Sequence, residues 1–182
     1  SGSGDDSGAG GSIWLFGSNI TGTGIINASG GHGQGGNNAG GGGGGRIAIT
    51  STGIINFTGQ IFNDGGRGTT ITREGSGGTI YINATVSIGS SFNASAISNN
   101  SRGGYINISD TILVLTGLIN VSGNSTAPGN ITINYTSCAS TFNVVFYPAY
   151  NNWSTITSCA GAGDTTPPNV TINFPAVFAN YS

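Results

Sequence analysis

The chain has 182 residues, of which 35 are glycine, and it carries only four basic and six acidic residues. Four arginines and no lysine on an acidic chain exclude the phosphate-neutralising surface that a nucleic-acid partner needs, and the many Ile, Val, Phe and Tyr residues exclude a charge-rich disordered chain. No apolar run approaches the length of a membrane span, which takes about 20 residues. We therefore expect a folded protein that stays soluble through hydroxyls, amides and covalent sugar.

Short runs rich in Ile, Thr, Val, Phe and Tyr, interrupted by Gly and Asn, predict strands along the chain. A Gly-x-Ile element recurs in GGSIWLF, GGRIAIT, GGTIYIN, GGYINIS and PGNITIN, and it spaces Ile13, Ile47, Ile80, Ile106 and Ile131 by 34, 33, 26 and 25 residues. A second element follows it as GIINAS, GIINFT, SFNAS, GLINVS and TFNVV, and most units add a third, such as VSI or ILVL. This repetition predicts units of two or three short strands whose like strands stack in parallel about 4.8 Å apart. A β-sandwich is the alternative if neighbouring strands pair as hairpins.

The GG-x-I-x-I element, the GIIN-type strand and the Gly-rich loops, over roughly residues 10–137, resemble the right-handed parallel β-helix repeats of large secreted and cell-surface proteins of archaea and bacteria. The resemblance implies an all-β fold, a right-handed parallel β-solenoid of about five coils. It implies a fold more than an activity, because that fold serves adhesins, stalks and polysaccharide-cleaving enzymes. The tract GGHGQGGNNAGGGGGG cannot pack a side-chain core, so we expect it on the surface or stacked as extended backbone.

The organisation that we expect is a Gly/Ser-rich segment over residues 1–11, the solenoid over 12–137, a capping segment over 138–163 and a trailing segment over 164–182. Cys138 and Cys159 flank a predicted hairpin, and a disulfide between them would contribute about 3 kcal/mol by the loop-entropy model. Two free buried thiols are the alternative. The end of the chain, DTTPPNVTINFP, looks like a Pro linker and the first strand of a bacterial-type immunoglobulin-like domain, or a strand donated to another subunit.

The acceptor motif for N-glycosylation, Asn-x-Ser/Thr, occurs at 14 asparagines, whereas the reversed order precedes only six. Strand alternation alone has no direction, so this asymmetry favours glycosylation. The middle residue is mostly apolar, which on a strand points it inward and turns Asn and the hydroxyl outward. The predicted sites are Asn19, Asn27, Asn56, Asn83, Asn93, Asn99, Asn107, Asn120, Asn124, Asn130, Asn134, Asn152, Asn169 and Asn180.

Residues that could carry catalysis are few. Asp64 and Glu74 share an inserted loop with Arg67 and Arg73, which suits a solvated loop with local ion pairs better than the clustered carboxylates of a polysaccharide-cleaving site. His32 lies alone in the glycine tract. Gly31, Gly33 and Gly36 fit G-x-G-x-x-G without the helix that phosphate binding needs. Tyr147, Tyr150 and Trp153 form an aromatic cluster, which we expect to pack as core or cap rather than to bind sugar.

The sequence therefore predicts an extracellular or cell-surface structural protein, with covalent N-linked glycans and with neither an enzyme's site nor a cofactor or metal. Unpaired backbone at the first and last coils, together with the trailing strand, suggests that copies associate head-to-tail into a surface fibre. A non-polymerising adhesin stalk is the main alternative, and a polysaccharide-degrading enzyme that uses Asp64 or Glu74 is the third.

Overall fold

The computed structural model describes residues 5–35, 38–70, 72–96, 101–123, 127–136, 141–147 and 153–157, the last two ranges and Ser90 by their backbone alone. Eight strands make up the regular structure of this part. They are β1 (Ser12–Gly22), β2 (Ile25–Asn27), β3 (Arg46–Phe62), β4 (Thr79–Asn93), β5 (Tyr105–Asn120), β6 (Asn130–Tyr135), β7 (Thr141–Tyr147) and β8 (Trp153–Thr157). All eight belong to one sheet, and every strand pair within it is parallel.

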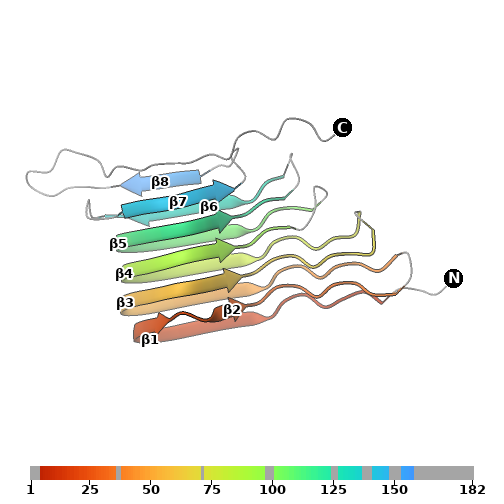
Figure 1. Ribbon diagram of the computed structural model, residues 1–182, viewed down its shortest axis with the longest axis horizontal. Helices are drawn as coiled ribbons and strands as arrows, with labels where there is room; N and C mark the ends of the chain where they lie inside the picture. Colours follow the sequence, from red (N-terminus) through yellow and green to blue (C-terminus); the bar gives the residue numbers. More distant parts are fainter. Residues whose placement is uncertain are drawn as a thin grey trace, which may run out of the picture.

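The strands follow the order β1-β3-β4-β5-β6-β8, with β2 paired to β3 and β7 paired to β5 (Figure 1). The register places the isoleucine of each Gly-x-Ile element opposite the isoleucine of the next element. One continuous row therefore runs across the sheet through Ile13, Ile47, Ile80, Ile106 and Ile131. The 25- to 34-residue spacing of these positions in the sequence is thus the length of chain between neighbouring strands of the sheet.

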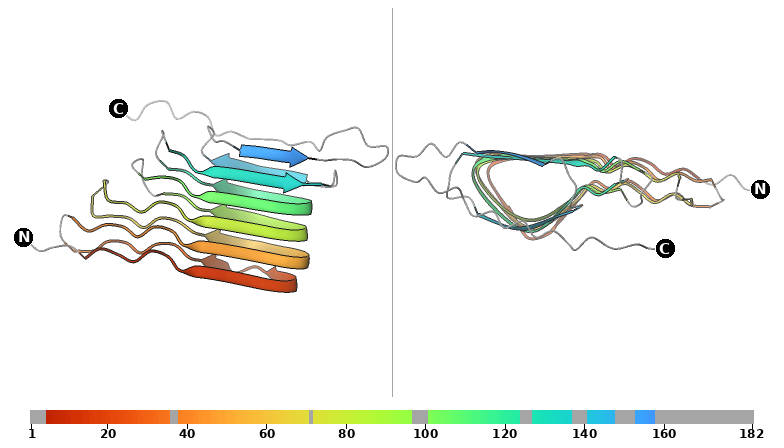
Figure 2. Two further views of the ribbon diagram at one scale, coloured as in Figure 1. Left: turned by 180° about the vertical axis from the view of Figure 1, so that it is seen from behind. Right: turned by 90° about the horizontal axis from the view of Figure 1, so that it is seen from above.

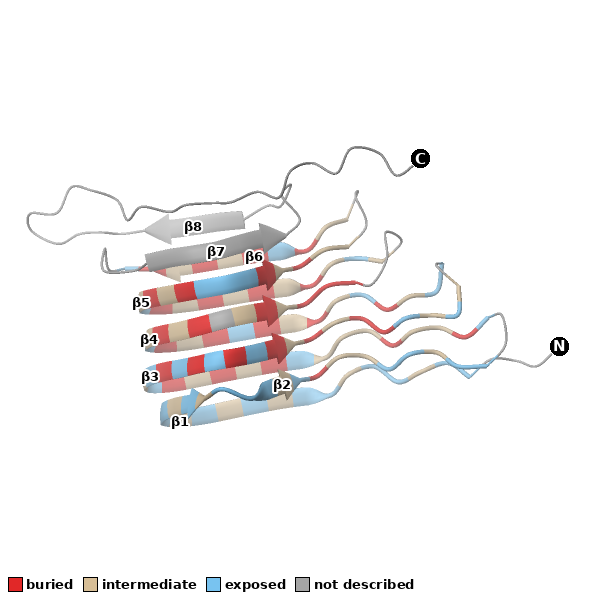
Figure 3. Cartoon of the chain, viewed as in Figure 1, coloured by how far each residue is buried: buried red, intermediate tan, exposed pale blue. Residues whose placement is uncertain are grey.

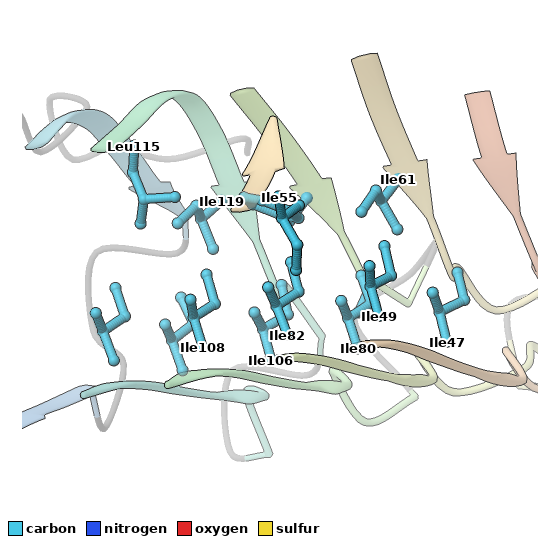
Figure 4. Close-up of a cluster of buried hydrophobic side chains, with 14 of the residues drawn as sticks. Ile47, Ile49, Ile55, Ile61, Ile80, Ile82, Ile106, Ile108, Leu115 and Ile119 are labelled. Carbon is cyan, nitrogen blue, oxygen red and sulfur yellow. The ribbon is translucent and has the colours of Figure 1, made fainter. Parts of the chain in front are cut away.

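The long strands curve around a common apolar core, and in the view along the stack they enclose it almost completely (Figure 2). Alternation supplies the core, because successive side chains of a strand point to opposite faces. In β3 the buried positions include Ile47, Ile49, Ile55, Phe57 and Ile61, while alternate residues such as Ala48, Asn56 and Gln60 are less buried and face outward. Side chains of the same kind from β4 and β5 lie beside them (Figure 4). Each fully buried isoleucine contributes about 2 kcal/mol through apolar surface removed from water.

Burial is greatest in the middle of the stack. The strands β3, β4 and β5 carry most of the fully buried positions, whereas the first strand, β1, has none (Figure 3). Its core-facing residues are only partly buried, although they pack against the same cluster. The strand β1 is therefore an edge of the sheet within the described part of the chain.

The glycine-rich segments form a thin blade beside the barrel-like sheet (Figure 2). We use "glycine blade" for residues 5–11, 28–35, 38–45, 63–70 and 72–78. Backbone hydrogen bonds join its two layers, as from Gly42 N–H to the Gly31 carbonyl at 3.0 Å and from Gly66 N–H to the Gly42 carbonyl at 2.7 Å. A Cβ atom on Gly66 would lie 1.7 Å from the Gly31 oxygen. Glycine is required there because the two backbones approach too closely for any side chain.

The expected right-handed solenoid of about five coils, closed by a disulfide-bonded hairpin, is wrong. The fold is all-β, but the four long parallel strands β1, β3, β4 and β5 each curve around the core and give the sheet a barrel-like outline, to which β2, β6, β7 and β8 are added. The separate short strands of each unit are fused, so that β3, β4 and β5 have 17, 15 and 16 residues. Strand pairing continues past the points where the short strands were expected to end, with register shifts such as the one between Thr50 and Ile54.

The expected C-terminal hairpin is contradicted by the pairing of its two strands. The strand β7 pairs in parallel with β5, and β8 pairs in parallel with β6, whereas a hairpin needs two neighbouring antiparallel strands. Both cysteines of the expected disulfide, Cys138 and Cys159, lie outside the described residues. The same holds for Tyr150, for residues 164–182 and for the sequon asparagines Asn99, Asn124, Asn152, Asn169 and Asn180.

Candidate functional site

The described sequon asparagines lie on the outside of the sheet, and the residues in the middle of their motifs point inward. Asn107 and Asn130, for example, precede Ile108 and Ile131, which are both fully buried. The predicted division of each motif into an inward apolar residue and an outward amide is confirmed at these positions. The exposed asparagines are Asn19, Asn27, Asn56 and Asn130, and the half-buried ones are Asn83, Asn93, Asn107, Asn120 and Asn134.

The Nδ2 atom, which would carry the sugar, donates a hydrogen bond at some half-buried asparagines, whereas at the exposed Asn19 and Asn27 it is Oδ1 that accepts one. Asn83 Nδ2 donates to the Ser109 carbonyl at 3.1 Å, and Asn107 Nδ2 donates to the Tyr105 hydroxyl at 3.1 Å. The Asn107 Oδ1 atom is buried without a hydrogen-bond partner. These amides are part of the sheet surface, whereas an exposed amide such as that of Asn130 is free to carry a bulky group.

The carboxylate of Asp64 has a structural role at the junction of the glycine blade and the sheet. It accepts hydrogen bonds from Ser95 N–H at 2.7 Å, from the Ser95 hydroxyl at 2.9 Å and from Asn93 Nδ2 at 3.0 Å. Burial raises the pKa of Asp64, and the two bonds from Ser95 oppose that rise. Its acceptor sites are therefore occupied by neighbours in the fold.

The other candidates from the sequence do not gather around Asp64 as a catalytic group. His32 and Asp64 both line an open depression, but the Nδ1 atom of His32 accepts the Arg67 N–H at 2.7 Å and so holds two segments of the glycine blade together. Glu74 is half-buried, with Oε2 in the interior of the blade. Within the described ranges, no group of three or more His, Cys, Asp and Glu side chains could hold a metal ion.

Asp110 on β5 is a buried carboxyl to which the sequence reasoning assigned no role. Only 6% of its surface is exposed, and Oδ1 accepts the Ala84 N–H from β4. Burial raises the pKa of Asp110 to about 7, against the lowering effect of the nearby Ser87 hydroxyl and the Ala84 N–H. Neither Asp110 Oδ2 nor Ser87 Oγ makes a regular hydrogen bond. Strand alternation offered the signal, since Asp110 follows the inward residues Ile106 and Ile108 at a spacing of two.

The first strands carry the most exposed of the large apolar side chains. Trp14 and Phe16 of β1 are 76% and 68% exposed, and Ile25 of β2 is 66% exposed. Trp14 lies opposite Ala48, which lies opposite Tyr81, so one row of the outer face contains two aromatic side chains. The aromatic cluster predicted from the sequence cannot be compared with this row, because the side chains of Tyr147 and Trp153 are not described.

Comparison with known proteins finds no matching family model, no matching curated protein and no matching solved structure. The described part of the chain contains no helix that is long and apolar enough to cross a membrane.

Proposed function

We propose that this chain is a heavily N-glycosylated, extracellular structural protein without catalytic activity, and that copies of it assemble head-to-tail into a surface fibre. The observation that carries the proposal is the unfinished edge of the sheet at β1. Parallel strands with unpaired edge N–H and C=O groups are a template for pairing with another chain.

The edge can be compared with the next strand position by position. Ile13, Leu15, Ile20 and Ile26 lie opposite Ile47, Ile49, Ile55 and Ile61, and all four of the latter are buried. The first four are only partly buried, although they pack against the same core. A further strand stacked on β1 would complete their burial.

A second copy of this chain is the partner that fits this edge best. The strands β1, β3, β4, β5 and β6 present isoleucine to the same row, from Ile13 to Ile131, and β8 continues it with Trp153. The far end of one copy therefore offers an apolar residue to the row that the first strand of another would meet. Such contact is between unlike ends, and unlike ends that do not close into a ring produce a filament. The strands β7 and β8 also pair in parallel with the strands before them, so the stack keeps one direction up to its last described strand.

The positions of the exposed sequon asparagines on the outer face of the sheet are compatible with a glycosylated fibre. The exposed amides of Asn19, Asn27, Asn56 and Asn130 extend outward from the sheet, where attached sugar would not obstruct stacking along the ladder direction. Sugar would also supply the solubility that so few charged residues do not provide. The proposal includes no catalytic role for Asp64, because its carboxylate accepts hydrogen bonds from Ser95 and Asn93 within the fold.

Two measurements on native material test the proposal. Sedimentation and electron microscopy should show filaments, and glycopeptide mass spectrometry should show sugar on the exposed asparagines. In recombinant protein, Leu15→Lys should abolish assembly, whereas Leu118→Lys, at a 40% exposed position on β5, should leave it intact. Monomers alone in native material, or equal assembly of the two variants, would overturn the fibre. Unmodified asparagine at all four exposed sites would overturn the glycoprotein.

A further inference from the structure

We infer that the outer face of β1, β3 and β4 binds an extended β-1,4-linked polysaccharide, which stacks on the aromatic side chains of Trp14 and Tyr81. This inference goes beyond the fibre and does not depend on it. Trp14 and Tyr81 are 76% and 38% exposed, and the register joins them through Ala48.

The orientation of the two rings follows from strand alternation. Trp14 lies between Ile13 and Leu15, which pack against the core, so the Trp14 side chain points to the outer face. Tyr81 lies between Ile80 and Ile82, both of which are buried. The two aromatic side chains therefore belong to the same face of one parallel sheet.

The distance between the positions of Trp14 and Tyr81 matches the repeat of an extended β-1,4-linked polysaccharide. They are two strands apart, which is about 10 Å at the strand spacing of a sheet. That distance is the length of a disaccharide unit in an extended β-1,4-linked chain, in which every second sugar presents the same face. A chain that crosses the strands can therefore place equivalent sugar faces on Trp14 and on Tyr81. Ala48 between them has no side chain long enough to hold the chain away.

Groups around the row suit sugar hydroxyls. Arg46 and Thr50 flank Ala48 on the same face of β3, and Thr79 and Asn83 flank Tyr81 on β4. Arg46 is exposed, and within the described ranges it forms no ion pair, so its guanidinium is available as a donor. No acidic residue lies on the outward positions of β1, β3 or β4 in this area. The face thus combines separated aromatic rings with neutral or cationic hydrogen-bonding groups.

A docked protein fits this face less well than a sugar chain. Protein interfaces have a contiguous apolar centre, whereas here Trp14 and Phe16 on β1 and Tyr81 on β4 stand apart across Ala48 and are bordered by threonine and arginine. A copy stacked on β1 would extend the sheet along its edge and would not cover a side chain that points out of the sheet face. Aromatic rings stack well on the apolar faces of sugars while their edges stay hydrated.

The experiment measures binding of the full-length chain to insoluble cellulose and chitin by depletion and to soluble hydroxyethyl cellulose by affinity electrophoresis. Trp14→Ala and Tyr81→Ala should each weaken binding about tenfold, the loss expected for one stacked aromatic side chain. Leu118→Ala is the matched control, because it removes exposed apolar surface outside the row. Thermal unfolding of each variant shows that the sheet is intact.

A swap variant tests the spacing. Tyr81→Ala combined with Ala48→Tyr keeps the aromatic content but moves the second ring one strand closer to Trp14. It should bind as weakly as Tyr81→Ala alone, and amylose, whose α-linked chain is coiled, should bind weakly to all variants. Absence of binding to all three β-1,4-linked polymers would overturn the inference. Equal losses for Leu118→Ala and Trp14→Ala, restored binding in the swap variant, or equally strong binding of amylose would do the same.

Discussion

Replacement of Asp110 by asparagine should change how stability depends on pH. In the folded chain burial raises the pKa of Asp110 from 3.8 to about 7. A raised carboxyl pKa means that the folded state binds the proton more tightly than the unfolded state does. The wild-type protein should therefore lose stability as pH rises from about 4 to about 7, and the loss attributable to this residue should level off above that range.

The size of the effect follows from the difference between the two pKa values. Each unit corresponds to about 1.4 kcal/mol, so a shift of about three units gives about 4 kcal/mol. Residual solvent contact, 6% of the residue surface, reduces this to an expected 2–4 kcal/mol. Asparagine keeps an oxygen for the Ala84 N–H and places an NH2 group toward Ser87, without a charge.

The assay is urea unfolding of wild-type protein and Asp110→Asn between pH 4 and pH 8, followed by circular dichroism. At pH 4 the two should be equally stable within about 1 kcal/mol, and at pH 8 the variant should be more stable by about 2–4 kcal/mol. Asp64→Asn serves as the comparison: asparagine keeps one oxygen for the two bonds from Ser95, but its NH2 group cannot accept the bond from Asn93 Nδ2. A difference between wild type and Asp110→Asn that stays constant with pH would refute the reasoning.

Three further predictions concern packing, backbone and modification. Ile80→Ala should lower the free energy of unfolding by about 2–5 kcal/mol in urea titrations, because Ile80 is fully buried at the centre of the isoleucine row. Gly66→Ala should cost about 3 kcal/mol or more, since its Cβ would meet a carbonyl oxygen at 1.7 Å, while Gly24→Ala, with open space around its Cβ, should change the melting temperature little. Glycopeptide analysis should find higher occupancy at exposed Asn130 than at half-buried Asn107, and the reverse order would contradict the role assigned to amide burial.

Some features of the fold could be predicted because they depend on local spacing. The recurrence of Gly-x-Ile predicted which isoleucines share a row, and the apolar middle residue of each sequon predicted which side of the strand faces inward. Both depend only on the two-residue period of a strand. Asp110 followed the same rule, and its inward position was readable from Ile106 and Ile108.

Features that depend on distant parts of the chain could not be predicted. Glycine and serine at Ser51 and Gly53 permit either a turn or an extended bulge, and pairing with β1 and β4 selects the extended form. The glycine tract was compatible with a surface loop or a stacked backbone. The choice is made by contacts such as that of Gly66 with Gly42, 24 residues earlier in the chain, which no local pattern contains.

The distribution of sequons over the outer face also bears on the polysaccharide site. On the part of the face that contains Trp14, the outward residues are Ser12, Trp14 and Phe16 on β1 and Arg46, Ala48 and Thr50 on β3, and none of them is a sequon asparagine. Sequons on this part of the face begin at β4 with Asn83, whose Nδ2 atom donates toward Ser109 on β5 and so away from β3. Asn107 on β5 lies opposite Tyr81, and its Nδ2 atom donates to the Tyr105 hydroxyl. Glycans on these later strands would therefore leave Trp14 and the first two strands uncovered. If the glycans did cover Trp14, enzymatic removal of the sugar from native protein would strengthen its binding to cellulose, whereas the arrangement of the sequons predicts no change.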